Sequence, residues 1–382
     1  MSGPSDICIG LMSGTSLDGV DACAVRFMPA PQVIANASKP FPRALRARLL
    51  WLAGATAPPP DEDPVVALGL ARRDLADCYA DTVAGLPRDL LAQASVIGAH
   101  GQTIRHHPEH GFSLQLLDGA RLAARTGIAV VNDFRSADLA LGGQGAPLVP
   151  AFHLAAFGRP GATSAVVNIG GIANVSVLAP APGAAGSDAP PVVRAGFDTG
   201  PGNRLLDDWI QHHRGEPFDE DGRWARRASV NPALLRQLRA DPYFARPEPK
   251  STGREAFNLA WLQAHLARLP DCDAGDVQAT LVELTAGTIV DAIAPYAPDE
   301  IIVCGGGARN GYLVQRLAAL GAPARCRDSA ALGMAAQSVE AAAFAWLAFK
   351  RLRAEPANLP ASTGARSGAI LGALHLPPPP GA

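Results

Sequence analysis

Residues 197–203 read Phe-Asp-Thr-Gly-Pro-Gly-Asn, which places Asp198 at the end of a predicted strand with Gly200 and Gly202 close behind it. Glycine permits positive φ and leaves room for a ligand beside the backbone. Three other glycine-rich turns, at 12–19, 168–174 and 304–310, each follow an apolar run that is typical of a β-strand. Together these features indicate an enzyme that handles phosphate, with Asp198 as its base. A strand-end aspartate can also simply cap the turn that follows it, and this alternative stays open.

Composition narrows the class of protein. The chain has 382 residues, of which 48% are hydrophobic and 18% charged, so it is long enough for two well-filled domains. A net charge of −2 gives no basic field, which argues against a nucleic-acid partner. None of the six cysteines has C-x-x-C spacing, which favours free thiols in a reducing compartment.

No signal peptide is visible, and the longest strongly apolar run, 341–349, is shorter than the ~20 residues of a membrane span. We therefore expect a soluble, cytoplasmic protein.

The order of predicted elements is similar in the two halves of the chain. Each half begins with a strand, a glycine turn and a second strand, at 7–27 and at 164–178, and continues with further strands and helices. The clearest predicted helices cover residues 65–86, 203–212, 259–269, 278–294 and 338–353. Although the two halves share almost no sequence identity, this order predicts a duplicated α/β protein with a cleft between two lobes.

The first glycine turn, Ser13 to Asp21, is a candidate for binding anionic oxygens. A tight hairpin with Gly14 and Gly19 turns several backbone N–H groups toward one point, and Thr15 and Ser16 add hydroxyl donors. Asp18 would repel a phosphate unless a divalent cation lay between them, as Mg²⁺ does through its water ligands. An Asx-type hairpin turn without a ligand is the alternative.

The other two glycine turns have similar alternatives. Residues 168–174 form either a second phosphate-binding loop or a plain Gly-Gly β-turn, and the glycines of 304–307 would let a flat base lie against the backbone. Neither G-x-x-x-x-G-K-[ST] nor G-x-G-x-x-G is present, so a nucleotide site would be of another design.

Several polar residues allow more than one interpretation. Asp133 and Asp138 would bind sugar hydroxyls, cap a turn or pair with Arg135. His100 stands at a strand end, where it contacts a ligand or only hydrogen-bonds its loop. His106 and His110 have the spacing of metal ligands on a helix, but Pro108 between them argues against a helix. Lys250 either holds an anionic group or is simply solvated.

Eight segments together resemble one family, the anhydro-N-acetylmuramic acid kinases. The resemblance runs in order from residue 9 to residue 373. It rests on residues 10–21, 98–103, 132–135 with 140–153, 168–174, 197–203, 249–255, 303–310 and 340–347.

The resemblance implies an α/β fold with two ribonuclease-H-like lobes of the sugar kinase, chaperone ATPase and actin superfamily, with ATP in a central cleft. The implied N-terminal lobe is 1–135, to which about 366–382 returns, and the C-terminal lobe is 136–365. Asp198 matches the catalytic aspartate, and Asp18 is the implied metal contact. The implied nucleotide contacts are Gly14, Thr15, Ser16, Leu17, Asp18, Gly19, Val20, Asp21, Gly170, Gly171, Gly305, Gly306 and Gly307. Expected sugar contacts are His100, Gln102, Asp133, Gln144 and Glu340.

The implied reaction converts 1,6-anhydro-N-acetylmuramic acid, ATP and water into N-acetylmuramic acid 6-phosphate and ADP, with Mg²⁺ as a second cofactor. The family resemblance also implies cell-wall recycling, a homodimer, and no nucleic-acid or membrane partner. Three alternatives remain: an amino-sugar kinase that acts on a free 6-hydroxyl, a non-kinase ATPase of the same superfamily, and a metal-dependent peptidase-like relative. The ATPase would need a peptide-binding appendage, and the peptidase-like relative would need a convincing histidine pair.

Overall fold

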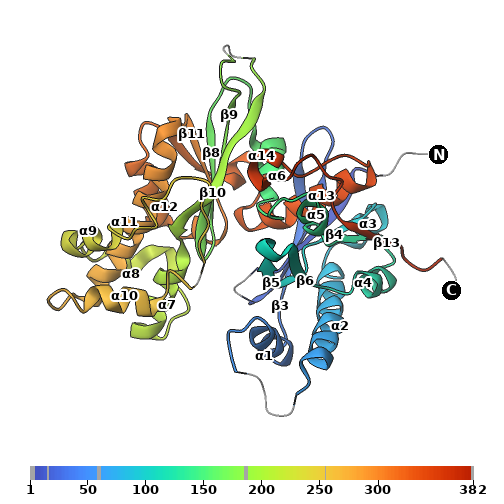
Figure 1. Cartoon of the computed structure of the whole chain (residues 1–382), viewed down its shortest axis with the longest axis horizontal. Coiled ribbons are helices and arrows are strands. Elements are labelled where there is room, and N and C mark those ends of the chain that lie inside the picture. The colour runs from blue at the N-terminus through green and yellow to red at the C-terminus, as the bar shows by residue number, and fades with distance from the viewer. Residues whose placement is uncertain (1–4, 15–16, 58–61, 185–187, 254, 380–382) are drawn as a thin grey trace. The chain divides into compact units, whose positions relative to one another are not determined.

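The chain folds into two compact units in a computed structural model that describes residues 5–14, 17–57, 62–184, 188–253 and 255–379 (Figure 1). Unit 1 consists of Met1–Ala156 and Gln337–Ala382, and unit 2 of Phe157–Ala336. Each unit has a hydrophobic core built on one mixed sheet.

The sheet of unit 1 has six strands in the order β13-β7-β4-β1-β2-β3. Strands β1, β2 and β3 form an antiparallel meander, and β4 and β7 continue the sheet parallel to β1. The strands are β1 (Ile7–Met12), β2 (Gly19–Arg26), β3 (Gln32–Pro40), β4 (Ile97–Ala99), β7 (Val130–Asn132) and β13 (Ala373–His375). A separate hairpin joins β5 (Gln102–His107) to β6 (Phe112–Leu116) through the 3₁₀ turn η1 (Pro108–His110).

The helices of unit 1 are α1 (Arg43–Leu52), α2 (Pro64–Val83), α3 (Arg88–Gln93), α4 (Gly119–Thr126), α5 (Ser136–Ala140), α6 (Val149–Phe157), α13 (Val339–Leu352) and α14 (Pro360–Thr363). Helix α13 packs on β1, β2 and β4, and two glycines of the sheet make room for it. A Cβ on Gly10 would lie 1.8 Å from the Ala341 carbonyl oxygen, and one on Gly98 would lie 1.9 Å from that of Phe344. Any larger residue at either position would therefore push the helix off the sheet.

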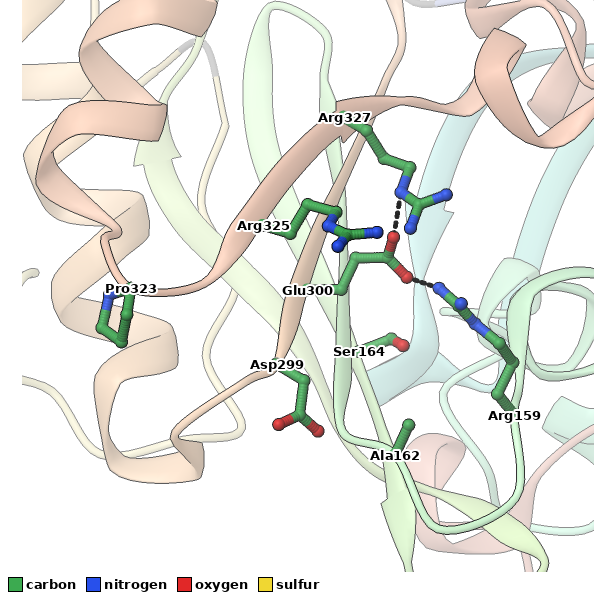
Figure 2. Close-up of a pocket in the computed structure, with 8 residues that line it drawn as sticks. All are labelled: Arg159, Ala162, Ser164, Asp299, Glu300, Pro323, Arg325 and Arg327. Atoms are coloured by element: carbon green, nitrogen blue, oxygen red, sulfur yellow. Dashed lines mark ion pairs between the residues drawn. The ribbon is translucent and has the colours of Figure 1, made fainter.

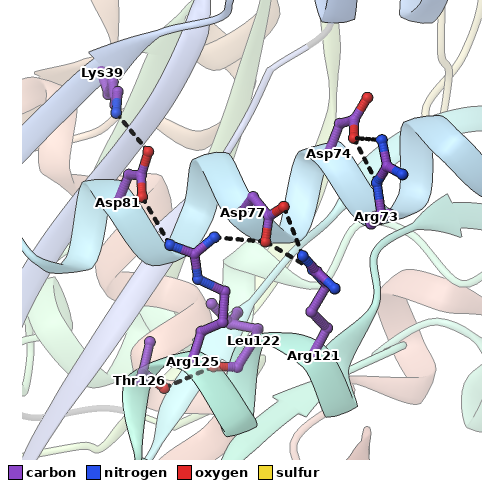
Figure 3. Close-up of polar contacts among 9 residues, drawn as sticks. All are labelled: Lys39, Arg73, Asp74, Asp77, Asp81, Arg121, Leu122, Arg125 and Thr126. Atoms are coloured by element: carbon purple, nitrogen blue, oxygen red, sulfur yellow. Dashed lines mark hydrogen bonds and ion pairs between the residues drawn. The ribbon is translucent and has the colours of Figure 1, made fainter.

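An ion-pair network joins α2 to α4 on the surface of unit 1 (Figure 3). Asp77 accepts hydrogen bonds of 2.7 Å from both Arg121 and Arg125. Asp81 pairs with Arg125 at 3.2 Å and with Lys39 of β3 at 2.7 Å. Because these pairs share partners, they constrain one another more than isolated surface pairs do.

Unit 2 repeats the strand order of unit 1. Its sheet runs β10-β9-β8-β11-β12, with β8, β9 and β10 as an antiparallel meander and β11 and β12 parallel to β8. The strands are β8 (Ser164–Ile169), β9 (Ile172–Pro180), β10 (Pro191–Pro201), β11 (Glu300–Cys304) and β12 (Arg325–Asp328). The prediction of two ribonuclease-H-like α/β lobes is confirmed, since each unit has a three-stranded meander extended by two parallel strands.

The helices of unit 2 are α7 (Asn203–Arg214), α8 (Arg223–Arg226), α9 (Pro232–Arg239), α10 (Leu259–Leu266), α11 (Ala274–Ile293) and α12 (Gly311–Leu320). Short 3₁₀ turns are η2 (Glu220–Gly222), η3 (Ala294–Tyr296), η4 (Gly306–Arg309), η5 (Ser329–Leu332) and η6 (Ala336–Ser338). The segment Ala274–Tyr296 is the one stretch within the described residues that is long and apolar enough to cross a membrane, but 72% of its most apolar window is buried. It is the central core helix of unit 2.

The boundaries of the two units differ from the predicted boundaries at residues 135 and 366. Residues 136–156 and 337–365 pack with unit 1. Asp138 explains part of this difference, because its fully buried carboxylate accepts hydrogen bonds from Asn358 at 2.6 Å and Thr363 at 2.7 Å. Asp138 therefore joins α5 to the C-terminal segment. Its carboxylate accepts these hydrogen bonds rather than pairing with Arg135 or facing a sugar.

Candidate active site

Asp198 lies on β10, where the neighbouring 243–252 segment holds it in place. Its backbone N–H donates to the Lys250 carbonyl at 3.0 Å, and the Tyr243 hydroxyl donates to the Asp198 carbonyl at 2.7 Å. The backbone N–H of Thr252 donates to Asp198 Oδ2 at 3.0 Å. One carboxylate oxygen is thus held by the protein, which orients the group, and no hydrogen bond to the second oxygen is found within the part of the chain that the structure describes.

Burial raises the pKa of Asp198 to about 6, and the hydrogen bond from Thr252 opposes the shift. A buried carboxylate loses the water that stabilises its charge, so its basicity increases. A pKa near 6 suits a general base, because the group is ionised at neutral pH and still accepts a proton readily.

Two other predicted loops of unit 2 meet the Asp198 segment at the ends of their strands. The backbone N–H of Gly202 donates to the Gly171 carbonyl at 3.0 Å, and that of Asn203 donates to the Gly170 carbonyl at 2.8 Å. The Asn203 side chain donates to the Ile169 carbonyl at 3.1 Å. The turn at Gly170 and Gly171 is therefore fixed directly against the turn that follows Asp198.

The third loop, at Gly305 to Gly307, reaches the same place from β11. Gly305 has φ +80°, and a Cβ there would lie 2.2 Å from Asn168 Oδ1. A Cβ on Gly307 would lie 2.4 Å from the Ile169 side chain. These contacts show why the sequence needs glycine here, and they bring the three predicted loops of unit 2 together.

Helix α7 begins at this cluster of loops. Its first turn contains no acidic residue, and its last turn carries His212, His213 and Arg214. The helix dipole is positive at its N-terminus, so the start of α7 favours a negative charge nearby. The positive end of this helix would stabilise the negative charge of a nucleotide phosphate.

The first glycine loop belongs to unit 1 and joins β1 to β2. The backbone N–H of Leu17 donates to the Gly14 carbonyl at 3.2 Å, and Leu17 itself has φ +58°. Val20 is buried in the core of unit 1, so only its backbone is available to a ligand, whereas Asp21 is exposed on β2. A Cβ on Gly19 would lie 2.3 Å from the Lys39 carbonyl oxygen. The predicted contacts Thr15 and Ser16 lie outside the described residues.

Asp18 suits a water-mediated magnesium contact. Its side chain is 76% exposed and lies 3.9 Å from the Arg46 guanidinium, too far for a tight ion pair. Mg²⁺ typically takes one or two carboxylates and completes its octahedron with water and phosphate oxygens. An exposed carboxylate beside a glycine loop fits that donor set.

A second cluster in unit 1 surrounds Arg135. The buried Arg135 guanidinium donates to the Gly145 carbonyl at 2.8 Å and lies 3.0 Å from His100 Nε2. Burial lowers the pKa of Arg135 to about 10, and the charge of Glu340 opposes this shift. The structure therefore brings His100, Glu340 and the loop of Gln144 around one arginine that the sequence offered only as a partner for aspartates.

His100 is neutral in this cluster. Burial, together with the charge of Arg135, lowers the pKa of His100 to about 3, while the backbone of Ser13 and Gly101 opposes the shift. Because a guanidinium only donates, Nε2 of His100 acts as the acceptor and the ring proton resides on Nδ1. His100 Nδ1 and Gln102 Oε1 are buried and have no hydrogen-bond partner of good geometry among the described residues. Unused polar atoms of this kind are typical of a site that receives a polar ligand.

The remaining predicted sugar contacts are more exposed. Asp133 has φ +55° and accepts a hydrogen bond from Ser136 at 2.6 Å. The Gln144 side chain is exposed, while its backbone N–H donates to the Thr363 carbonyl at 2.8 Å. The positive φ of Asp133, two residues before Arg135, is a feature often found at functional sites.

The structure distinguishes between the alternatives that the sequence left open for the histidine-rich segment and for Lys250. His106 lies on β5 and the chain then forms a 3₁₀ turn, so the helical pair of His106 and His110 does not form. Ligand atoms of His107, Glu109 and His110 instead lie within 4.8 Å of one another at the end of the hairpin. Lys250 Nζ donates to the Phe244 carbonyl at 3.0 Å and so supports the Asp198 segment.

Comparison with known proteins places the chain in a family. A sequence model described as anhydro-N-acetylmuramic acid kinase matches residues 6–377. The anhydro-N-acetylmuramic acid kinase of Variovorax paradoxus is 49% identical over 380 residues, covering 97% of this chain and 99% of the relative. That of Ralstonia nicotianae is 50% identical over 386 residues, covering 97% of each.

Solved structures that the chain resembles include component A of the (R)-2-hydroxyglutaryl-CoA dehydratase of Acidaminococcus fermentans. The TM-score is 0.45 and the identity 11%, covering 91% of this chain and 100% of that one. The fold and the site define an α/β protein with two ribonuclease-H-like units and an aspartate among glycine loops. The chain belongs to the anhydro-N-acetylmuramic acid kinase family.

Proposed function

We propose that this protein uses ATP to open 1,6-anhydro-N-acetylmuramic acid with water and to phosphorylate the freed oxygen 6. The products are N-acetylmuramic acid 6-phosphate and ADP. Family membership supports the substrate and the reaction. The observation that carries the mechanism is Asp198, an oriented carboxylate whose pKa is raised to about 6 by burial beside three glycine loops.

The substrate explains why a base must act on water. In a 1,6-anhydro sugar, oxygen 6 bridges to the anomeric carbon, so there is no free 6-hydroxyl to attack ATP. Asp198 takes a proton from water, and the water oxygen bonds to the anomeric carbon as the bond to oxygen 6 breaks. This resembles glycoside hydrolysis by a carboxylate base. Oxygen 6 leaves with the electron pair and bonds to the γ-phosphorus as the bond to ADP breaks.

The nucleotide contacts are the glycine loops. Gly14, Leu17, Asp18, Gly19, Val20 and Asp21 of unit 1, with Thr15 and Ser16, form the proposed first loop. Gly170, Gly171, Gly305, Gly306 and Gly307 of unit 2 form the others, beside the positive end of α7. Mg²⁺, held through water by Asp18, would offset phosphate charge.

The sugar contacts are proposed from the polar cluster of unit 1. His100 Nδ1–H and Gln102 would bond sugar oxygens, and Glu340, Asp133 and Gln144 would complete the set. Arg135, which the sequence offered only as a partner for aspartates, joins them because its buried charge suits the carboxylate of the lactyl group. We also propose a cytoplasmic homodimer, as the family resemblance implies.

Isotope incorporation tests this function. The protein is incubated with ATP and the anhydro sugar in ¹⁸O-water, with free N-acetylmuramic acid as the alternative substrate. We expect the anhydro sugar to be converted, and mass spectrometry to find ¹⁸O in the anomeric hydroxyl and none in the phosphate ester. Because the anomeric hydroxyl exchanges slowly with water, product is analysed at early times beside an unlabelled product control. Conversion of free N-acetylmuramic acid alone would indicate an ordinary sugar kinase and refute the proposal.

A further inference from the structure

A basic pocket lies at the ends of the unit 2 strands that are opposite to the glycine loops. Figure 2 shows the side chains that line it. Its volume is about 340 Å³, and its polar lining consists of Arg159, Ser164, Asp299, Glu300, Arg325 and Arg327. Ser164, Glu300 and Arg325 are the first residues of β8, β11 and β12, whereas the glycine loops follow the last residues of β8 and β11. The pocket and the glycine loops are therefore separated by about five residues of strand, or roughly 16 Å.

Strand register puts the lining side chains on one face of the sheet. Glu300 is the direct neighbour of Ser164 on one side and of Arg325 on the other. Arg327 is two residues beyond Arg325, and side chains two apart in a strand share a face. These side chains lie close together in Figure 2 because the register of the sheet places them side by side on one face.

The charges of the pocket do not balance. Glu300 is 4% exposed and pairs with both Arg159 and Arg327. Asp299 Oδ2 accepts a hydrogen bond from the Thr163 backbone at 2.9 Å, and so serves the preceding turn. Three arginines against two carboxylates leave one positive charge in excess. In Figure 2, Arg325 extends toward Glu300, whose two oxygens are already engaged by the other two arginines.

Ser164 is a second, independent sign of a ligand. It is 1% exposed, lines the pocket, and its hydroxyl has no hydrogen-bond partner among the described residues. A buried hydroxyl without a partner costs free energy, so its presence at the wall of a charged pocket points to an absent acceptor.

We propose that this pocket binds a small phosphate-bearing anion at a site separate from the proposed nucleotide loops. Arg325 would bind the anion through its planar fork of donors, and the Ser164 hydroxyl would donate to another oxygen. The volume is at the low end of the ~300–1,000 Å³ of small-molecule sites, which suits phosphate, diphosphate or a sugar phosphate rather than a nucleotide. The proposal does not depend on the reaction that the protein catalyses.

Binding is measured by calorimetry on the full-length protein, with a non-hydrolysable ATP analogue at saturation so that the nucleotide site is filled. Inorganic phosphate, diphosphate and glucose 6-phosphate are compared, which separates a free anion from a phosphate ester. We expect saturable binding of at least one of them. Arg325→Gln should weaken it about tenfold or more and Ser164→Ala several-fold, in proportion to the hydrogen bonds lost.

The matched control is Arg223→Gln, which removes an equally charged side chain that pairs with Glu220 elsewhere on unit 2. It should leave binding unchanged. Ser164→Ala removes only an unpartnered hydroxyl, so this variant should fold even if Arg325→Gln does not. Saturable binding of none of the three anions would overturn the proposal. Binding that Arg325→Gln and Ser164→Ala leave intact, or that Arg223→Gln weakens equally, would overturn it too.

Discussion

At the scale of single residues, the proposed chemistry depends on the environment of the Asp198 carboxylate, which sets its basicity and its orientation. Asp198 is removed from water enough to become a better base, yet Thr252 holds one of its oxygens and Tyr243 holds its backbone. A fully solvated aspartate would be ionised but weakly basic, and a fully buried one would be protonated at neutral pH. The observed arrangement lies between these two cases.

Activity should therefore depend on pH through Asp198. A general base works in its unprotonated form, so kcat/KM should level off about one pH unit above the pKa of about 6, be half-maximal near pH 6, and fall about tenfold per pH unit well below it. The profile of kcat/KM against pH measures this, with circular dichroism at each pH as a control for unfolding. A profile that stays flat well below pH 6 in folded protein would remove Asp198 from this role.

The loops that meet at Asp198 were predictable from sequence, because glycines mark each of them. Asp198 and the glycines of its neighbouring loops stand in short local motifs, and the structure brings those of unit 2 together. Arg135 was not predicted as the centre of a site, because its significance comes from His100 and Glu340, which lie 35 residues before it and about 200 residues after it. Tyr243 was missed for the same reason, since its contact with Asp198 spans 45 residues of chain.

At the scale of elements, two glycines decide how close α13 comes to the sheet of unit 1. Gly98→Ala should lower the free energy of unfolding by about 3 kcal/mol or more, because the new methyl group would overlap the Phe344 carbonyl. Chemical denaturation measures the change.

Gly69→Ala is the matched control for that substitution. Gly69 lies inside α2, and a Cβ there would have no neighbour within 4 Å. Alanine should raise the free energy of unfolding by about 0.5–1 kcal/mol, because it restricts the unfolded chain and favours helix. Equal effects of the two substitutions would mean that the close contact with α13 does not exist in solution.

The ion network between α2 and α4 gives a second element-scale prediction. Hydrogen bonds from Arg121, and then from Arg125, lower the pKa of Asp77. A lowered pKa adds stability above the ordinary aspartate pKa of about 3.9, and this stability is lost as the pH falls through the folded-state value. Asp77→Asn should therefore cost about 1–2 kcal/mol at neutral pH.

Thermal or chemical unfolding of Asp77→Asn at several pH values measures this contribution. The deficit should shrink in strong acid and in high salt, where the charges are neutralised or screened. Asp271→Asn, at an exposed loop position before α11, is the control and should change stability little. A deficit that is the same at all pH values would show that the charge of Asp77 is not what joins the helices.

At the scale of the whole molecule, the repeated strand order followed from the sequence, but the unit boundaries did not. Each glycine turn follows an apolar strand, and this local pattern was enough to indicate two α/β units. The two compact units divide the chain near residues 156 and 337 rather than at the expected 135 and 366, because α13 packs on strands that lie more than 200 residues earlier. No local pattern reports such a contact.

The residues of the proposed reaction are divided between the units, with the base in unit 2 and the expected sugar contacts in unit 1. The most direct test is the turnover of Asp198→Asn, measured with ATP and anhydro sugar binding in the same preparation and with Asp208→Asn as the matched control on α7. The amide keeps the shape and the acceptor for Thr252, so we expect both ligands to bind nearly as in the parent protein. Turnover should fall roughly 10²–10⁴-fold or more. Near-normal turnover in Asp198→Asn would contradict the account.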